Sequence, residues 1–312
     1  MDQIRVNLLF IISIVFLLFG CQSINSGIPS ADPPREAELS NIKDASLNNM
    51  FLSEGDDEDY LLIVAGHIYG SHKPTASHPA DSFLSNLGYF ANLNPSMMIL
   101  LGDIVPYSTE IDFQNLEDSF LNKQTYPIFN AVGNHDVENR QLYEERYGQT
   151  FFSFPYRSSY IIILDTELDN CKITGIQLEI LETALEEAVH DAKISQIFIF
   201  AHKVLFFDQT LLQRLQNSQS QLPNDRYACA LSNNYNQLLT DLFLPTAKNK
   251  PVYLLSGDVG AWGGNLTPYR AQYQGSDFHI LTTGIGDTPQ DAVILINVRE
   301  DSTEIKYISL TK

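Results

Sequence analysis

Apolar runs separated by polar turns fill the chain after residue 58 and predict buried strands that alternate with amphipathic helices. Short unbroken apolar runs are typical of strands that are covered on both faces. The expected strands are residues 60–64, 97–101, 127–132, 151–154, 160–164, 197–201, 252–255, 278–282, 292–298 and 304–310. The turn Arg157-Ser158-Ser159 between two of them predicts a hairpin.

Helical spacing of apolar residues predicts helices over residues 81–93, 111–121, 175–190 and 235–243. The third has the most regular pattern, with one apolar stripe made of Ile176, Ile180, Leu181, Leu185 and Val189. Residues 208–231 are polar and irregular and predict an excursion over the surface. The roughly 255 residues after the leader suffice for one large α/β domain or two small ones.

The first 20 residues predict a targeting segment rather than part of the fold. Arg5 precedes a short apolar stretch from Leu8 to Phe19, and Leu18-Phe19-Gly20-Cys21 resembles the lipobox of bacterial lipoproteins. The stretch is short for a membrane span of roughly 20 residues, so we favour a lipoprotein signal over an ordinary anchor. We therefore expect lipidation of Cys21 and attachment outside the cytoplasm, at an outer membrane or a periplasmic face.

Residues 21–57 are largely polar and contain several prolines, as flexible tethers do. The acidic run from Glu54 to Asp59 fits a solvated leader better than a calcium site. We therefore place the folded domain at residues 58–312. Cys171 and Cys229 are the cysteines within it, and whether they form a disulfide is left open, because sequence separation does not show that two cysteines meet.

The formal net charge of −19 argues against nucleic acid as a partner, because phosphates repel such a field. A phosphate-containing substrate stays compatible with this charge, since a bound metal ion reverses the field locally.

Polar side chains follow five predicted strands directly. Carboxylates and imidazoles at strand ends suit metal binding and proton transfer, and α/β sheets place their sites there. Each residue alone has a plain explanation as a helix cap, a turn residue or a packed core histidine. Their joint occurrence favours a shared metal site. The residues are His67, Asp103, Asn134 with His135, His202 and Asp258.

These motifs resemble those of the calcineurin-like metallophosphoesterases. Gly102-Asp103 and Gly133-Asn134-His135-Asp136 match the motifs of that family, and Phe200-Ala201-His202 is similar to its lone-histidine motif. Gly175 and Gln177 at the start of the preceding helix also fit. The resemblance implies an α/β fold of two packed mixed β-sheets flanked by helices, an αββα sandwich, from about residue 60 to the C-terminus.

Two motifs depart from the family pattern. The first reads Ala65-Gly66-His67 and lacks the aspartate of the family, and the last reads Gly257-Asp258-Val259-Gly260 and lacks both histidines. Of the ligands that the resemblance implies for one ion, His67 and Asp103 remain. For the other ion Asp103, Asn134 and His202 remain, with Asp258 at the place of a histidine.

The resemblance therefore implies one altered metal site and one broken site, with one or two divalent ions. A carboxylate in place of an imidazole favours Mn, Fe or Mg over Zn. His72 and His78 are candidates to refill the broken site, although solvated loop histidines are the favoured interpretation. Lys203 and Arg270 are candidates to supply the positive charge that a lost ion leaves missing.

By the same resemblance, His135 protonates the leaving group and Asp136 orients it. We thus expect a metal-dependent phosphoester hydrolase anchored outside the cytoplasm, acting on a phosphorylated small molecule or an envelope phosphoester. The alternative is a catalytically degenerate binding or scaffold lipoprotein of the cell envelope. The nature of the phosphoester is left open.

Overall fold

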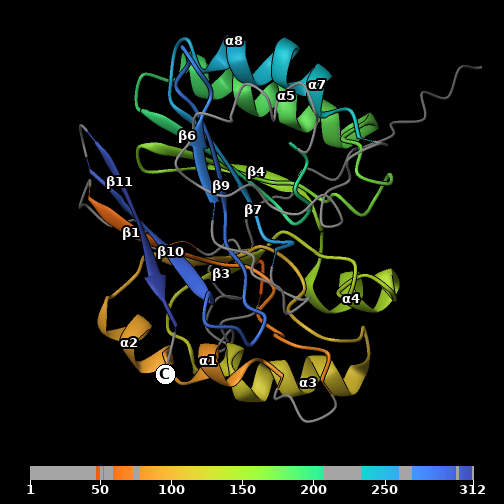
Figure 1. The fold of residues 1–312 in the computed structure, drawn as a ribbon. Coiled ribbons are helices and arrows are strands. Elements are labelled where there is room, and N and C mark those ends of the chain that lie inside the picture. The colour runs from red at the N-terminus through yellow and green to blue at the C-terminus, as the bar shows by residue number, and fades with distance from the viewer. Residues whose placement is uncertain are drawn as a thin grey trace, which may run out of the picture. The chain divides into compact units, whose positions relative to one another are not determined.

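Two mixed β-sheets lie between layers of helices (Figure 1). The strands are β1 (Tyr60–Ala65), β2 (Met97–Leu100), β3 (Ile128–Asn130), β4 (Phe152–Tyr156), β5 (Ser159–Ile163), β6 (Gln196–Ala201), β7 (Val252–Ser256), β8 (Tyr269–Gln272), β9 (Phe278–Thr282), β10 (Ala292–Val298) and β11 (Thr303–Ser309). One sheet has the order β11-β10-β1-β2-β3 and the other the order β4-β5-β6-β7-β9-β8. This architecture confirms the predicted fold class.

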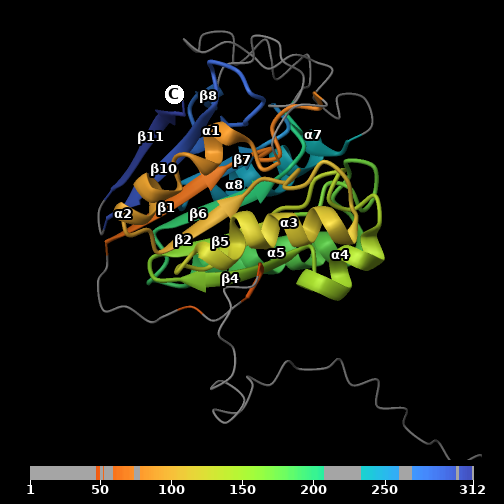
Figure 2. The same cartoon turned by 90° about the horizontal axis from the view of Figure 1, so that it is seen from below.

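The helices cover the outer faces of the two sheets, as the turned view in Figure 2 also shows. The first sheet carries α1 (Asp81–Leu84), α2 (Leu87–Asn92), α3 (Glu110–Ser119), η2 (Leu121–Lys123) and α4 (Arg140–Tyr147). The second sheet carries α5 (Gly175–His190), α7 (Tyr235–Leu238), η4 (Leu239–Phe243) and α8 (Leu244–Thr246).

The structure is a computed structural model that describes residues 47–49, 52, 59–73, 78–206, 233–259, 269–299 and 302–310. Chain contacts separate Met1–Lys43 from Asp44–Lys312, and every described residue belongs to the second unit. The predicted signal peptide, Cys21, most of the predicted tether and the whole predicted surface excursion lie outside the described residues. Among the helices of the described part, none has the length and apolar character needed to cross a membrane.

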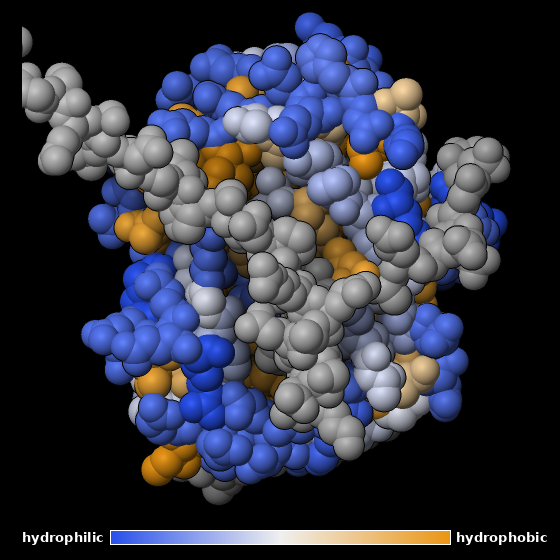
Figure 3. All heavy atoms as spheres, turned by 180° about the vertical axis from the view of Figure 1, so that it is seen from behind, coloured by the Kyte–Doolittle hydropathy of each residue, from blue (hydrophilic) through white to orange (hydrophobic). Residues whose placement is uncertain are grey.

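The unbroken apolar runs arise because both faces of the strands are covered. In β6, Phe198 and Phe200 face the core between the sheets, whereas Ile197 and Ile199 face the helices. All six residues of this strand are buried. The outer surface is different: in the view of Figure 3, hydrophilic residues dominate the rim of the described part.

The helix predicted over residues 81–93 is interrupted between α1 and α2. The Asn86 side chain donates to the Ser82 carbonyl at 2.8 Å, while the Asn86 backbone N–H donates to Phe83 instead. An asparagine side chain that takes a backbone acceptor in this way competes with the regular helix. The sequence did not predict α4 or β8.

The predicted apolar stripe of α5 is confirmed at Leu181 and Leu185, which are buried, and is wrong at its first residue, Ile176. Ile176 is 68% exposed, whereas Gln177 is 1% exposed and belongs to the buried face. The Gln177 amide accepts from the Asp165 backbone N–H at 2.6 Å and donates to the Asp165 carbonyl at 3.1 Å. These two bonds satisfy the amide inside the protein, so a polar residue replaces an apolar one on this face.

Part of the predicted tether belongs to the folded domain. Leu47 is buried, and the Asn48 backbone N–H donates to the Ile128 carbonyl at 2.9 Å. The Asn48 side chain accepts from the Asn130 N–H at 2.9 Å. The predicted boundary at residue 57 is therefore too late for residues 47–49. Cys171 is disulfide-bonded, and the other two cysteines of the chain lie outside the described residues.

Candidate metal centre

The carboxyl ends of strands from both sheets meet at one place. β1, β2 and β3 run parallel in the first sheet, and β6 and β7 run parallel in the second. Five predicted site residues follow these strands, and contacts of 2.6–3.8 Å join them directly or through Lys203. They are His67, Asp103, Asn134, His202 and Asp258. The structure thus brings together the side chains that the sequence placed at separate strand ends.

Glycines allow this close approach. Gly102 has φ +74°, and a Cβ atom there would lie 2.5 Å from Nδ1 of His202. A Cβ atom on Gly133 would lie 2.2 Å from Oδ1 of Asp103. Both contacts are far shorter than any real Cβ contact. The glycines that precede Asp103 and Asn134 are therefore steric requirements of the site and not only turn residues.

His67 and His202 face the same carboxylate oxygen. Nε2 of His67 lies 3.3 Å from Oδ2 of Asp103, and Nε2 of His202 lies 3.4 Å from the same oxygen. The Nδ1 atoms are held by backbone carbonyls, at 3.0 Å from Ile285 and 2.7 Å from Leu101. Among the described residues, both Nε2 atoms are buried without a hydrogen-bond partner. Two buried imidazole nitrogens that converge without hydrogen bonds are an arrangement typical of metal ligands.

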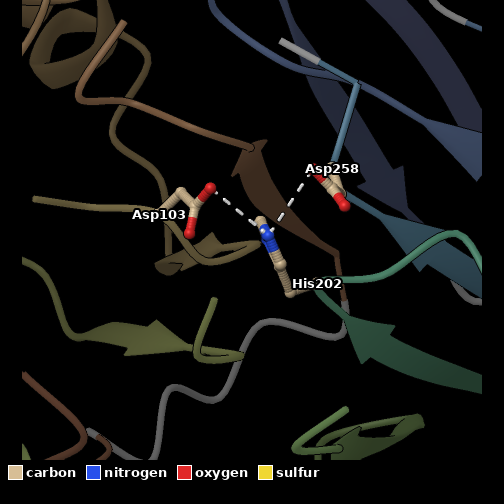
Figure 4. Close-up of side chains that lie close together, drawn as sticks. All are labelled: Asp103, His202 and Asp258. Atoms are coloured by element: carbon tan, nitrogen blue, oxygen red, sulfur yellow. Dashed lines mark ion pairs between the residues drawn. The ribbon is translucent and has the colours of Figure 1, made fainter. Parts of the chain in front are cut away.

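The spacing of Asp103, His202 and Asp258 suits one divalent ion. Ligand atoms at about 2.1 Å from an ion lie roughly 3.0–3.4 Å from each other in octahedral or tetrahedral geometry. The distance from Oδ2 of Asp103 to Nε2 of His202 matches this range, and Nε2 of His67 lies at a similar distance from that oxygen but does not belong to the candidate ligand group within the described part. Oδ1 of Asp258 lies 3.8 Å from Nε2 of His202, and Figure 4 shows the imidazole between the two carboxylates. Asp103, His202 and Asp258 offer ligand atoms within 4.8 Å of one another.

The backbone at two of these residues is strained. His67 has φ 54° and Asp103 has φ 53°, a left-handed conformation that is uncommon for residues other than glycine. Such conformations cost roughly 1–3 kcal/mol each and gather at functional sites. The strain sets Asp103 where its Oδ1 accepts the His135 backbone N–H at 3.1 Å and its Oδ2 faces the imidazoles.

The surroundings shift the pKa values of the two histidines in opposite directions, which favours a neutral His67 and a protonated His202. Burial lowers the pKa of His67 to about 4, against the opposing effect of Asp103. Burial also acts to lower the pKa of His202, but Asp103 and Asp258 outweigh it and raise this pKa to about 9. Burial acts to raise the pKa of Asp103, whereas the two imidazoles hold it well below its usual range. A divalent ion at this place would replace the proton on His202.

Asn134 contacts a lysine. Its Oδ1 accepts from Nζ of Lys203 at 2.6 Å, and the same ammonium donates to Oδ2 of Asp258 at 2.9 Å. Oε1 of Glu167 lies 3.7 Å from this ammonium. Burial acts to lower the pKa of Lys203, but Asp258 and Glu167 outweigh it, so the pKa is raised. Lys203 directly follows His202 in the chain, and this adjacency was the sequence signal for it. Arg270, the other candidate, is an exposed residue of the edge strand β8.

The predicted role of Asp136 as the partner of His135 is wrong. Oδ2 of Asp136 accepts from the backbone N–H groups of Gly133 and Asp103, both at 2.9 Å, and Oδ1 accepts from Ile104 at 2.8 Å. Asn130 donates to Oδ2 as well, at 3.2 Å. The carboxylate therefore connects the loop after β2 to the loop after β3 by hydrogen bonds. Burial and the nearby Asp103 raise the pKa of Asp136 to about 6, against these hydrogen bonds.

The imidazole of His135 is oriented by a backbone carbonyl. Its Nδ1 lies 2.8 Å from the Pro106 carbonyl and its Nε2 lies 3.5 Å from the Tyr69 hydroxyl. The hydroxyl in turn lies 2.5 Å from Nε2 of His72, and Nδ1 of His78 lies 2.8 Å from the Tyr69 carbonyl. His72 and His78 thus surround Tyr69, and the candidate ligand group within the described part does not include them. No pattern in the sequence pointed to Tyr69.

The chain is similar to solved phosphatase and phosphoesterase structures. A purple acid phosphatase from yellow lupin (Lupinus luteus) seeds matches with a TM-score of 0.49 and 13% identity over 82% of this chain, which spans about half (52%) of the lupin chain. A predicted phosphoesterase from Streptococcus pneumoniae matches with a TM-score of 0.36 and 10% identity, covering 81% of this chain and 90% of that chain. The phosphopantetheinyl hydrolase of Mycobacterium tuberculosis matches with a TM-score of 0.36 and 11% identity, covering 72% and 89%.

Neither a family model nor a curated protein sequence matches the chain. At TM-scores of 0.49 or lower, the likeness to solved structures carries no conclusion about the function of this chain. The case for a function therefore rests on the two-sheet α/β fold and the converging side chains of this chain.

Proposed function

We propose that this protein is a metal-dependent phosphoester hydrolase with an altered centre that works with one divalent ion. The observation that carries the proposal is the group of Asp103, His202 and Asp258, three buried residues whose ligand atoms all lie within 4.8 Å of one another. Such an ion would polarise a phosphoryl oxygen and lower the pKa of a water molecule. The mixed imidazole and carboxylate set fits Mn, Fe, Zn or Mg, and the second carboxylate favours the harder ions.

The residues of the chain have separate tasks in this proposal. Asp103, His202 and Asp258 hold the ion, and His67 faces the same oxygen of Asp103 as His202 does. His135 gives a proton from Nε2 to the leaving oxygen, and its Nδ1–H stays on the Pro106 carbonyl throughout. The transfer takes the ring from the doubly protonated to the neutral form, while a water oxygen bonds to phosphorus and the bond from phosphorus to the leaving oxygen breaks. The substrate is a phosphorylated small molecule or an envelope phosphoester.

Metal removal and reloading test this proposal. The full-length protein, stripped with a chelator, should hydrolyse neither p-nitrophenyl phosphate nor bis(p-nitrophenyl) phosphate above background. Reloading with Mn²⁺, Fe²⁺, Zn²⁺ or Mg²⁺ should restore turnover with at least one ion, in proportion to bound metal. A reloaded protein that binds metal and leaves a broad set of monoesters and diesters intact would sink the hydrolase proposal.

A second function is favoured by one specific contact. The oxygens of Asn134 and Asp258 already bind the Lys203 ammonium, so part of the donor set is engaged within the protein. Under the alternative, the chain is a binding or scaffold lipoprotein of the cell envelope that keeps the fold without turnover. The metal experiment separates the two, because the alternative predicts a folded protein without phosphoester hydrolysis under any metal.

We further propose that residues 1–20 are a lipoprotein signal and that Cys21 is lipidated, which would hold the domain outside the cytoplasm. The support is the short apolar stretch followed by Leu18-Phe19-Gly20-Cys21. Full-length protein expressed in a bacterium should partition into the detergent phase of a Triton X-114 extract, and Cys21→Ser should abolish its labelling by palmitate. Equal labelling of both proteins would exclude Cys21 as the lipid site.

A further inference from the structure

A lysine ammonium lies inside the candidate metal centre. Lys203 follows the last residues of β6, and its Nζ lies 2.6 Å from Oδ1 of Asn134 and 2.9 Å from Oδ2 of Asp258. The side chain is 17% exposed. Because two acceptors hold the ammonium at these distances and the side chain is largely buried, the ammonium is a fixed part of the site.

The loop after β5 holds Lys203 in place from the other side. Its backbone N–H donates to the buried Thr166 hydroxyl at 3.1 Å, and the Glu167 carboxylate lies 3.7 Å from its ammonium. The ammonium therefore has an amide oxygen and two carboxylates around it. An amide oxygen with carboxylates is also a donor set that hard divalent ions accept.

The ammonium takes the oxygens that a second ion would need. A divalent ion would lie about 2.1 Å from oxygen ligands of this kind, in the space that Nζ now occupies. Asp258 lies between the two positions, because its Oδ2 contacts the ammonium while its Oδ1 lies 3.8 Å from Nε2 of His202. On the other side, Asp103, His202 and Asp258 offer ligand atoms within 4.8 Å of one another, and Nε2 of His202 is buried without a hydrogen bond from the described residues. One half of the centre thus has its cation built in, and the other half is suited to receive one.

We propose that the Lys203 ammonium replaces a second metal ion, so that the centre takes one ion and presents a metal and an ammonium together to an anionic phosphoester. This inference rests on the proposed function, which identifies the bound anion as a phosphoester substrate. It makes Lys203 a residue that contacts the substrate. The ammonium supplies one positive charge where a second divalent ion would supply two. It also explains why Asp258, which lies where the family motif has a histidine, leaves no unpaired negative charge: the Lys203 ammonium pairs with its carboxylate.

The number of bound ions tests the replacement. Full-length protein dialysed against Mn²⁺ and measured by elemental analysis should contain about one ion per chain, and Lys203→Ala should contain about two, because the freed oxygens accept a second ion. The double variant Lys203→Ala with Asn134→Ala should return to about one, which places the extra ion at Asn134. Two ions in the unchanged protein, or one or none in Lys203→Ala, would overturn the inference.

Two controls keep the result specific. Lys203→Arg retains the positive charge and should stay at about one ion, and Lys193→Ala removes an exposed lysine elsewhere and should also stay at one. Far-UV circular dichroism should show that all variants are folded. The count requires no substrate, so a protein with one ion and no turnover would refute the hydrolase function while leaving the replacement intact.

Discussion

Asp103→Asn is expected to abolish metal binding and, with it, phosphoester turnover. Oδ2 of Asp103 is the atom that both imidazoles face, at 3.3 and 3.4 Å. Two unit charges at 4 Å attract by roughly 4 kcal/mol in a protein environment, which corresponds to roughly a thousandfold in affinity. Loss of the carboxylate charge should therefore weaken Mn²⁺ binding by about three orders of magnitude, as titration calorimetry would measure.

Asparagine is the appropriate replacement because it separates charge from backbone conformation. Asp103 has φ 53°, and asparagine tolerates this left-handed region almost as well as aspartate does. Asp118→Asn, on the exposed face of α3, makes the same chemical change away from the centre and should leave affinity and turnover unchanged. Retention of Mn²⁺ affinity within tenfold in Asp103→Asn would contradict the assignment of this residue as the central ligand.

The position of the site could be predicted from sequence because it depends on strand ends. The carboxyl ends of parallel strands meet at one sheet edge, so the polar residues after Leu100 and Asn130 had to approach one another once these segments were strands. The approach of His202, which follows Ala201, depends in addition on how the second sheet packs on the first. The strand β10 has the bounds that its apolar run predicted. These are local patterns, and a buried parallel strand has little freedom to depart from them.

The roles of individual polar side chains could not be predicted from the sequence, because these roles depend on contacts between distant segments. Asp136 follows His135 in the chain, yet its carboxylate turns to the amides of the Asp103 loop, more than 30 residues away. Lys203 was only one of two candidate cations until its long side chain was seen to reach Asp258. Asn48 looked like tether, and its pairing with β3 depends on an unsatisfied strand edge that the linear pattern does not display.

His135→Ala is expected to lower kcat by about 10²–10⁴-fold while metal content and stability change little. The imidazole makes one hydrogen bond to a backbone carbonyl, and its loss should cost only about 1 kcal/mol of unfolding free energy. A proton donor matters most for a poor leaving group. The variant should therefore lose more activity on phenyl phosphate than on p-nitrophenyl phosphate, which steady-state kinetics on the Mn²⁺-loaded protein would show.

The neighbouring residue, Asp136, provides the contrast, because its carboxylate binds backbone N–H groups and takes no part in the reaction. In Asp136→Asn, only one oxygen remains, and the amide N–H₂ group faces N–H groups of Gly133, Asp103 and Ile104 that need an acceptor. The variant should therefore lose about 3 kcal/mol of unfolding free energy, as urea denaturation would measure. His190→Ala, at the exposed end of α5, should change neither quantity. Equal losses on both aryl phosphates in His135→Ala, or a stable Asp136→Asn, would show that the roles of these two adjacent side chains are assigned wrongly.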